Sequence, residues 1–405
     1  MTSRYADLDR SRLAVLVPEL LLCGQLIDRS GMAWCISALG REEMARIAIE
    51  EWMAASPIYT RRMQRALGYE GSDVVTIFKG LQLDIGAPPQ FMDFRYTVHD
   101  PWHGEFRLDH CGALMDVEPM GESYVRAMCH DIEDPTFDAT AVATNARAQV
   151  RPIHRPPRTP ADRQPHCAWS VTIDESHPPV HESEGCRRLR QSRAAILELD
   201  RIDPSDEGLG DYSGPLLSDV DFGAFSRSAL VRIADEVALQ GQLLNLGFVL
   251  AVTGRLPAAE ARELCVKQLV GIAGVAAERI QRALGLPAGI EGALQVLRLH
   301  PMLNPHAYVD AQVTDRLVVR ASPAHDDGGW LSLLGPSSVR PLQAAVRAVD
   351  PHLDVEVSGS ATDWEARVVV RDEPAAVADE VAVTRFSTGA SFTFEPRLAL
   401  PITPL

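Results

Sequence analysis

The chain has 405 residues, of which 46% are hydrophobic and 23% charged, and its formal net charge is −16 at pH 7. That length exceeds one ordinary hydrophobic core and predicts two domains or more. The acidic charge excludes nucleic acid and anionic membrane surfaces as main partners, because both attract basic patches.

The N-terminal segment and the cysteines indicate the compartment. Residues 1–31 mix apolar residues with Asp7, Asp9, Pro18 and Glu19, which fits neither a signal peptide nor a membrane-spanning helix. The chain has seven cysteines, an odd number spread along its length, and these do not form a secreted disulfide framework. We therefore expect a cytoplasmic protein with reduced thiols.

Hydrophobic periodicity predicts helices followed by strands, the order of elements in an α+β unit. Apolar residues near a period of 3.6 predict helices at about 9–30, 40–68 and 71–84. Alternation predicts a hairpin of two strands, joined by HDPWH, at 91–98 and 104–111. The remaining elements are a helix near 119–132 and strands near 147–154 and 167–173.

The sequence then repeats itself. RMQRALG at 62–68 returns as RIQRALG at 279–285, and the same offset of 217 pairs Glu19 with Glu236 without a gap from about residue 10 to 97. The match resumes after the hairpin, where DPTFD at 134–138 aligns with DPHLD at 350–354. We predict an internal tandem duplication in which each repeat packs helices on a roughly four-stranded antiparallel sheet.

The predicted domains follow the repeats. The first repeat spans 1–195, the linker 196–219 and the second repeat 220–405, and the linker residues 200–219 are rich in Asp, Gly, Ser and Pro. The copies differ where polar chemistry gathers: Ala321, Ser322, Ala345 and Val346 replace His110, Cys111, Cys129 and His130. The loop HDPWH is mostly deleted in the second repeat. This divergence predicts a working first repeat and a structural second one.

Three residues of the first repeat form a candidate metal site for zinc or iron. His110 is placed on the apolar strand face with Phe106 and Leu108, and helical spacing puts Cys129 on the core side. Cys167 shares a strand face with Trp169. His110, Cys129 and Cys167 together are a zinc or iron ligand set, and a bulge at the strand end would add Cys111.

Catalytic candidates lie around this set. Carboxylates that can act as ligand or general base are Glu118, Glu122, Asp131, Glu133 and Asp134, of which Glu118 and Glu122 are preferred. The metal-free alternative is a thiolate nucleophile, Cys111 or Cys129, activated by a histidine such as His130. The packing alternative remains open, because free cysteine usually behaves as a small buried hydrophobe.

Substrate contacts are expected from an arginine-rich strand. Alternate spacing in NARAQVRPIHRPPR (145–158) places Arg147 and Arg151 on one face, where they can clamp a carboxylate or phosphate. A solvated strand face with surface ion pairs is the alternative interpretation. His103 in the hairpin loop is a further candidate for substrate contact.

Three short segments carry a resemblance to a known family: HCGAL at 110–114, AMCHDIED at 127–134 and HCAWSV at 166–171. In this order, the first repeat resembles the L-2-amino-thiazoline-4-carboxylate hydrolase-like family and related vinyl-reductase-type small-molecule-binding domains. The resemblance covers about 90 residues and touches only Cys111, Cys129 and Cys167. It implies ring-opening C–N hydrolysis of a small heterocyclic carboxylate, or sensing of a small ligand.

The sequence thus supports two main hypotheses and a structural third. The first is a metal-dependent hydrolase of a small polar or carboxylated molecule, with metal-activated water and a carboxylate that moves the proton. The second is a non-catalytic module that binds or senses a metal, a tetrapyrrole or another small molecule in the same pocket. The third is a tandem domain with incidental thiols. A small molecule is the expected partner, and the chain is compatible with a homo-oligomer.

Overall fold

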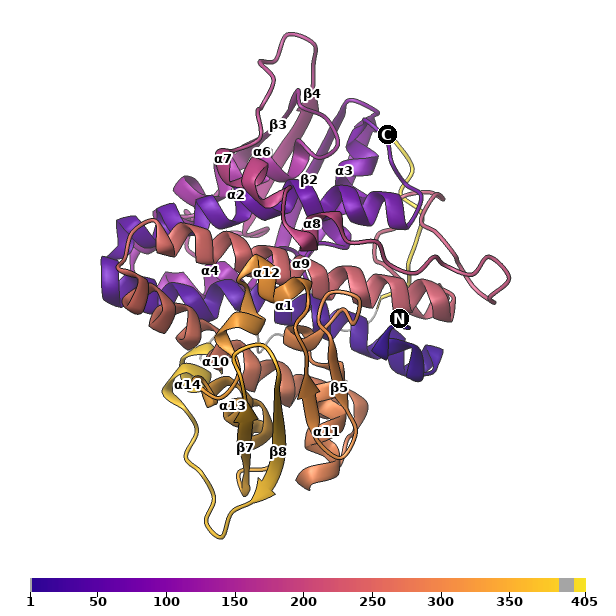
Figure 1. Cartoon of the computed structure of the whole chain (residues 1–405). Helices are drawn as coiled ribbons and strands as arrows, with labels where there is room; N and C mark the ends of the chain where they lie inside the picture. The colour runs from indigo at the N-terminus through magenta and orange to yellow at the C-terminus, as the bar shows by residue number, and fades with distance from the viewer. Residues whose placement is uncertain (1, 386–396) are drawn as a thin grey trace.

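The computed structural model describes residues 2–385 and 397–405. Two four-stranded antiparallel sheets lie at opposite ends of the molecule, and long helices fill the space between them (Figure 1). The predicted α+β fold, with one four-stranded antiparallel sheet in each half, is therefore confirmed.

The first repeat begins with three helices and continues with a sheet that is interrupted by a long helical connection. The helices are α1 (Arg10–Leu39), α2 (Arg41–Ala66) and α3 (Val74–Gln82). The strands are β1 (Met92–Asp100), β2 (His103–Cys111), β3 (Ala148–His154) and β4 (Cys167–Ile173). The connection consists of α4 (Gly112–Val117), η2 (Glu118–Met120), α5 (Glu122–Arg126), the π-helical turn η3 (Ala127–Ile132) and α6 (Glu133–Ala141).

The second repeat has the same order of helices and strands, but the strands of its hairpin are shorter. Its helices are α9 (Arg227–Thr253), α10 (Ala258–Leu284), α11 (Gly289–Leu299) and α13 (Arg340–Val349). Its strands are β5 (Ala311–Val313), β6 (Leu317–Val319), β7 (Leu353–Gly359) and β8 (Trp364–Val370). The sheet orders, β1-β2-β4-β3 and β5-β6-β8-β7, are the same topology, as a duplication requires.

Local sequence explains where the long helices begin. The Asp9 side chain accepts a hydrogen bond from the Arg12 amide at the start of α1, and Ser226 caps α9 in the same way. The 85° φ of Gly40, a conformation that glycine adopts without strain, separates α1 from α2. Side-chain caps and a glycine turn therefore set where these helices begin and end.

The long helices of each repeat pack against those of the other repeat. α1 packs chiefly along α9 and α10, and α9 packs along α2. At the α2–α9 crossing, a Cβ on Gly247 would lie 2.9 Å from the Glu51 carbonyl oxygen, so only glycine fits there. At the equivalent crossing, Ser30 of α1 donates a 2.7 Å hydrogen bond to the carbonyl of Gln268 in α10. The helices of the two repeats thus share one core.

Two equivalent ion pairs join the repeats across this core. Arg62 of α2 reaches Glu236 of α9 at 2.9 Å, and both side chains are almost fully buried. Arg279 of α10 reaches Glu19 of α1 at 2.5 Å. Because Arg62 and Arg279 occupy the same position of the repeated heptapeptide, the pairs are reciprocal, as in a twofold interface between two copies of one surface. This explains why the heptapeptide stands out in both halves.

Among the described residues, only helix α9 is long and apolar enough to span a membrane, with a mean hydropathy of 1.2 over its most apolar stretch of 18 residues. Within the protein, 83% of that stretch is buried, and α9 packs against α1 and α2. Its apolar character is therefore accounted for by the shared core.

The C-terminal segment returns to the first sheet. Residues 397–405 run beside the linker, where Ile402 donates to Leu216 and Leu217 bridges to Pro401. The amide of Leu405 donates to the Val98 carbonyl of the edge strand β1 at 3.0 Å. The C-terminal segment and the linker thus both contact the edge strand of this sheet.

We predict that Arg62→Ala lowers the free energy of unfolding by about 2–3 kcal/mol, because it leaves a buried Glu236 with fewer partners. Arg279→Ala should cost about 1 kcal/mol, since its pair with Glu19 is more exposed. Urea denaturation followed by circular dichroism measures both.

Arg126→Ala is the matched control, because the Arg126–Glu122 pair lies on the surface within one repeat and should contribute less than about 0.5 kcal/mol. If all three variants lose the same stability, the reciprocal pairs do not hold the repeats together.

Candidate functional site

A β-bulge at the end of β2 decides which side chains face the interior. Asp93 of β1 pairs with His110 and Phe94 pairs with Leu108, so Asp109 is an extra residue without a partner of its own. The extra residue shifts the alternation of side chains, so that Leu108 and Cys111 point to the same face of the sheet.

The bulge turns Cys111 inward and His110 outward. Leu108 and Cys111 are both 3% exposed, whereas His110 is half-buried and lies beside His166 with ring centroids 6.0 Å apart. The expectation that His110 shares the apolar face with Leu108 is wrong for this reason. The bulge considered for Cys111 is present.

Three cysteines and one carboxyl group come together beneath the sheet. Cys111 ends β2, Cys129 lies in the π-helical turn and Cys167 begins β4. Each lies close enough to Glu133 for its charge to raise the thiol pKa. Burial is the larger cause: it raises the pKa of Cys111 to about 12 and those of Cys129 and Cys167 far above the usual range. The thiols are protonated at neutral pH, whereas the thiolate is the nucleophile and metal ligand.

The predicted metal set His110, Cys129 and Cys167 is not gathered as a ligand group. Among the described residues, the single group of three such side chains with all ligand atoms within 4.8 Å of one another is His99, His103 and Glu105. His110 is kept apart because the bulge directs it to the outer face of the sheet.

The predicted catalytic side chains make local contacts instead of meeting one another. Glu118 accepts two hydrogen bonds from Arg158, at 3.0 and 2.9 Å. Glu122 pairs with Arg126 on the surface, and the His130 Nε2 lies 2.7 Å from the Pro156 carbonyl oxygen.

The predicted substrate-binding arginines are also engaged within the first repeat. Arg151 pairs with Asp138 at 2.9 Å. Arg147 donates to the His177 carbonyl and lies 3.3 Å from Glu175. These are contacts of a solvated strand face, the alternative that the sequence left open. His103 stacks on His99, with ring centroids 4.5 Å apart.

A cavity lies between the inner face of the first sheet and the helices α1, α2 and α4–α6. It has two adjoining chambers, of about 760 Å³ and about 670 Å³ with their mouths, whose walls share Gln25, Asp28, Ala113, Met128 and Ile132. The larger chamber is walled mainly by apolar side chains, and it also contains the sulfur-bearing Cys167. Concave apolar walls with a few polar groups are typical of a small-molecule site.

Three acidic side chains belong to the lining of the larger chamber. Burial raises the pKa of Asp84 to about 6, although the Tyr59 hydroxyl and the Gly86 amide both donate hydrogen bonds to it. Burial also raises the pKa of Glu133, to about 8, against the lowering effect of Arg155. The pKa of Asp28 is raised by burial as well. Glu133 is therefore mostly protonated at neutral pH.

The second repeat carries neutral residues at the positions of Asp28 and of its buried neighbour Glu51. Asp28 lies beside Glu51, whose pKa is raised well above its usual value by burial and by the neighbouring Asp28. Asn245 and Gln268 occupy the equivalent positions and form a 2.8 Å hydrogen bond between neutral amides. The first repeat thus keeps two carboxyl groups where the same fold accepts a neutral pair.

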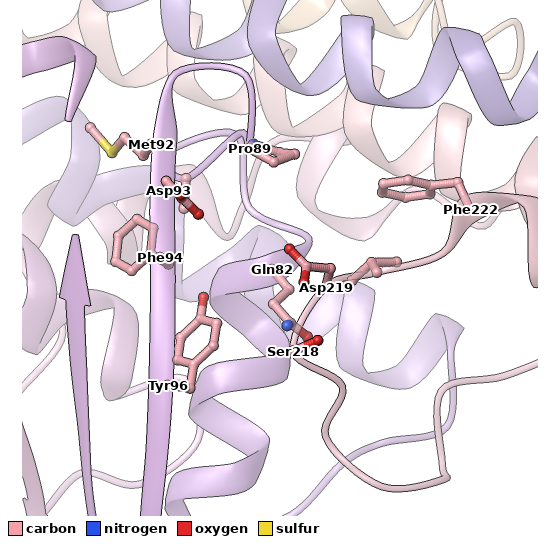
Figure 2. Close-up of a pocket in the computed structure, with 11 residues that line it drawn as sticks. Gln82, Pro89, Met92, Asp93, Phe94, Tyr96, Ser218, Asp219 and Phe222 are labelled. Atoms are coloured by element: carbon pink, nitrogen blue, oxygen red, sulfur yellow. The ribbon is translucent and has the colours of Figure 1, made fainter. Parts of the chain in front are cut away.

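A smaller depression lies at the sheet edge, outside this cavity. Asp93 of β1 and Asp219 of the linker face it from opposite sides, and it encloses about 460 Å³ (Figure 2). Arg95 bridges the two carboxylates and Arg397 also pairs with Asp93. These contacts attach the linker and the C-terminal segment to the sheet.

Comparison with family models, with curated proteins and with solved structures gives no match. The resemblance of the first repeat to the thiazoline-carboxylate hydrolase-like family therefore stays a prediction. The cavity acids Asp28 and Asp84 were missed because each stands in a long apolar segment. A position-by-position comparison of the repeats would have found Asp28, because Asn245 replaces it.

We predict that Glu133→Gln changes how stability depends on pH. Between pH 4.5 and about 8 the folded wild type holds a proton on Glu133 that the unfolded chain has lost, so its stability falls as pH rises through this range. The slope for one proton is at most about 1.4 kcal/mol per pH unit. Glu133→Gln should remove this slope, as measured by urea denaturation from pH 5 to 9.

Thr136→Val is the control, because it alters a neutral neighbour in the same chamber wall and should keep the slope. Equal slopes for wild type and Glu133→Gln would mean that Glu133 is ionised in the folded protein.

Proposed function

We propose that the first repeat binds a small molecule with an apolar body and an amino or similar donor group in the two-chambered cavity. The apolar walls accommodate the body, because side chains such as Leu81, Phe94 and Phe137 line the larger chamber. Asp28, Asp84 and Glu133 supply acceptors for the donor group. This is the binding alternative predicted from the sequence, with its ligand chemistry now specified.

One observation carries the proposal. Oε2 of Glu133 and Oε1 of Gln25 are buried without a hydrogen-bond partner among the described residues, and both side chains line the cavity. Buried polar atoms in folded proteins are almost always hydrogen-bonded. A ligand that donates hydrogen bonds would satisfy both oxygens and would offset the cost of their burial.

The charge of the walls favours an amine over the carboxylate expected from the sequence. No lysine or arginine belongs to the described lining of the larger chamber. Arg29 lines the smaller one, but it lies 3.7 Å from Asp116. In the larger chamber a carboxylate would therefore meet acidic groups and no cation of the described lining, whereas an amino group can donate hydrogen bonds to the carboxyl oxygens of Asp28, Asp84 and Glu133.

Hydrolysis is the second candidate, and Glu133 is the observation that favours it. A carboxyl group with a pKa of about 8 beside a cavity has the properties of a general acid or base near neutral pH. The metal site that this hypothesis included lacks one expected ligand, because the bulge directs His110 away from Cys129 and Cys167. Binding needs only the cavity and its acceptors, so it is the simpler proposal.

Isothermal titration calorimetry with benzylamine, benzyl alcohol and benzoate tests the proposal, because the three probes share one apolar ring. Hydrogen bonds to charged groups contribute about 1.5–3 kcal/mol, so benzylamine should bind at least about tenfold more tightly than benzoate. Ala113→Leu should weaken benzylamine binding, because Ala113 forms the wall common to both chambers.

Ala258→Leu adds the same side chain at an exposed position of α10 and is the matched control. Benzoate binding more tightly than benzylamine, or Ala113→Leu binding like wild type, would contradict the proposal.

A further inference from the structure

The hairpin between β1 and β2 brings three metal-binding side chains together on the outer face of the first sheet. Nε2 of His99 lies 3.3 Å from Oε1 of Glu105, and the His99 and His103 rings stack at 4.5 Å with an interplanar angle of 29°. The ligand atoms of all three residues lie within 4.8 Å of one another. Two imidazoles and a carboxylate are a ligand set that suits divalent transition metals.

The site is separate from the cavity. Phe106 and Leu108 of β2 point to the inner face of the sheet, and Glu105 lies between them in the alternation and points to the outer face with His103. The side chains of His99 and Glu105 are 30% and 40% exposed, whereas Nε2 of His99 is itself buried and makes no hydrogen bond among the described residues.

The surrounding backbone holds the hairpin turn in place. The Pro101 carbonyl accepts a hydrogen bond from Val74 at the start of α3, and the Trp102 carbonyl accepts one from Ile173 at the end of β4. The Asp100 side chain accepts a hydrogen bond from the Trp102 amide within the turn. Fixed turn geometry keeps both histidines beside each other before any ion arrives, which lowers the ordering cost of binding.

A neighbouring side chain can orient one of the rings. The Ser170 hydroxyl of β4 lies 3.4 Å from Nε2 of His103. Metal-binding histidines usually have such a partner on their other ring nitrogen, which fixes the tautomer and the ring orientation.

The second repeat has no equivalent of this feature. β5 and β6 are three residues long, whereas β1 and β2 are nine, and the turn between β5 and β6 contains no histidine. The fold therefore forms without the longer hairpin, so the three donors are not required for the sheet itself.

We propose that His99, His103 and Glu105 bind one divalent transition-metal ion of the zinc class on the outer face of the first sheet. Three protein ligands leave at least one coordination position open to water, which is the pattern of zinc sites that act on an external ligand. This site is independent of the small-molecule cavity, and neither proposal needs the other.

Calorimetric titration of the untagged, chelator-treated full chain with zinc chloride tests this proposal. We expect about one equivalent of zinc per chain and no comparable binding of magnesium, which prefers all-oxygen sites. The double variant His99→Ala/His103→Ala should weaken zinc binding by about 100-fold or more, and Glu105→Gln by about tenfold.

His181→Ala is the matched control, since His181 is an exposed histidine of the same repeat outside the group, and it should bind zinc like wild type. Zinc should also raise the melting temperature of the wild type but not that of the double variant, whose fold is checked by circular dichroism. A wild type that binds no zinc, or a folded double variant that binds it equally well, would overturn the proposal.

Discussion

The reciprocal packing of helices between the two repeats is the constraint on which the rest of the structure depends. Each repeat places its first helix against the second helix of the other, and equivalent arginines, Arg62 and Arg279, close the contact with Glu236 and Glu19. A helix that is buried on both sides is mainly apolar around its circumference, which accounts for the high hydropathy of α9. With the helices committed to one central layer, the sheets are left at opposite ends (Figure 1). Each sheet has one face toward the helices and one face outward. In the first repeat the cavity lies at the inner face, and the group of His99, His103 and Glu105 lies at the outer face.

Duplication leaves one copy free to give up tight packing. The second repeat pairs Asn245 with Gln268 as neutral amides, whereas the first keeps Asp28 and Glu51 as buried carboxyl groups, of which Asp28 lines the cavity. Burying such groups costs stability unless a partner satisfies them. The long helices that both repeats supply can offset that cost. The same reasoning applies to the longer hairpin of β1 and β2, which adds a turn with two histidines to a sheet that forms without it.

Much of the architecture could be predicted from the sequence, because repeat offset and hydrophobic period are local signals that survive without knowledge of contacts. The site was harder, for three physical reasons. A single extra residue at Asp109 exchanged the faces of His110 and Cys111, and a bulge leaves no clear mark in an alternating pattern. Asp28 was hidden in a long apolar helix, where one acidic residue hardly changes the periodicity. His99 and Glu105 lie on paired strands, so their closeness depends on register and not on spacing along the chain.

The central claim is that the cavity of the first repeat, and not its equivalent in the second, receives a small donor-bearing ligand. A crystal structure with 4-bromobenzylamine tests this most directly, because the anomalous signal of bromine marks the position of the ring. We expect one bromine peak in the larger chamber near Phe94 and Phe137, with the amine within hydrogen-bond distance of Asp84 or Glu133. A bromine peak only on the surface or between the helices and sheet of the second repeat would contradict it.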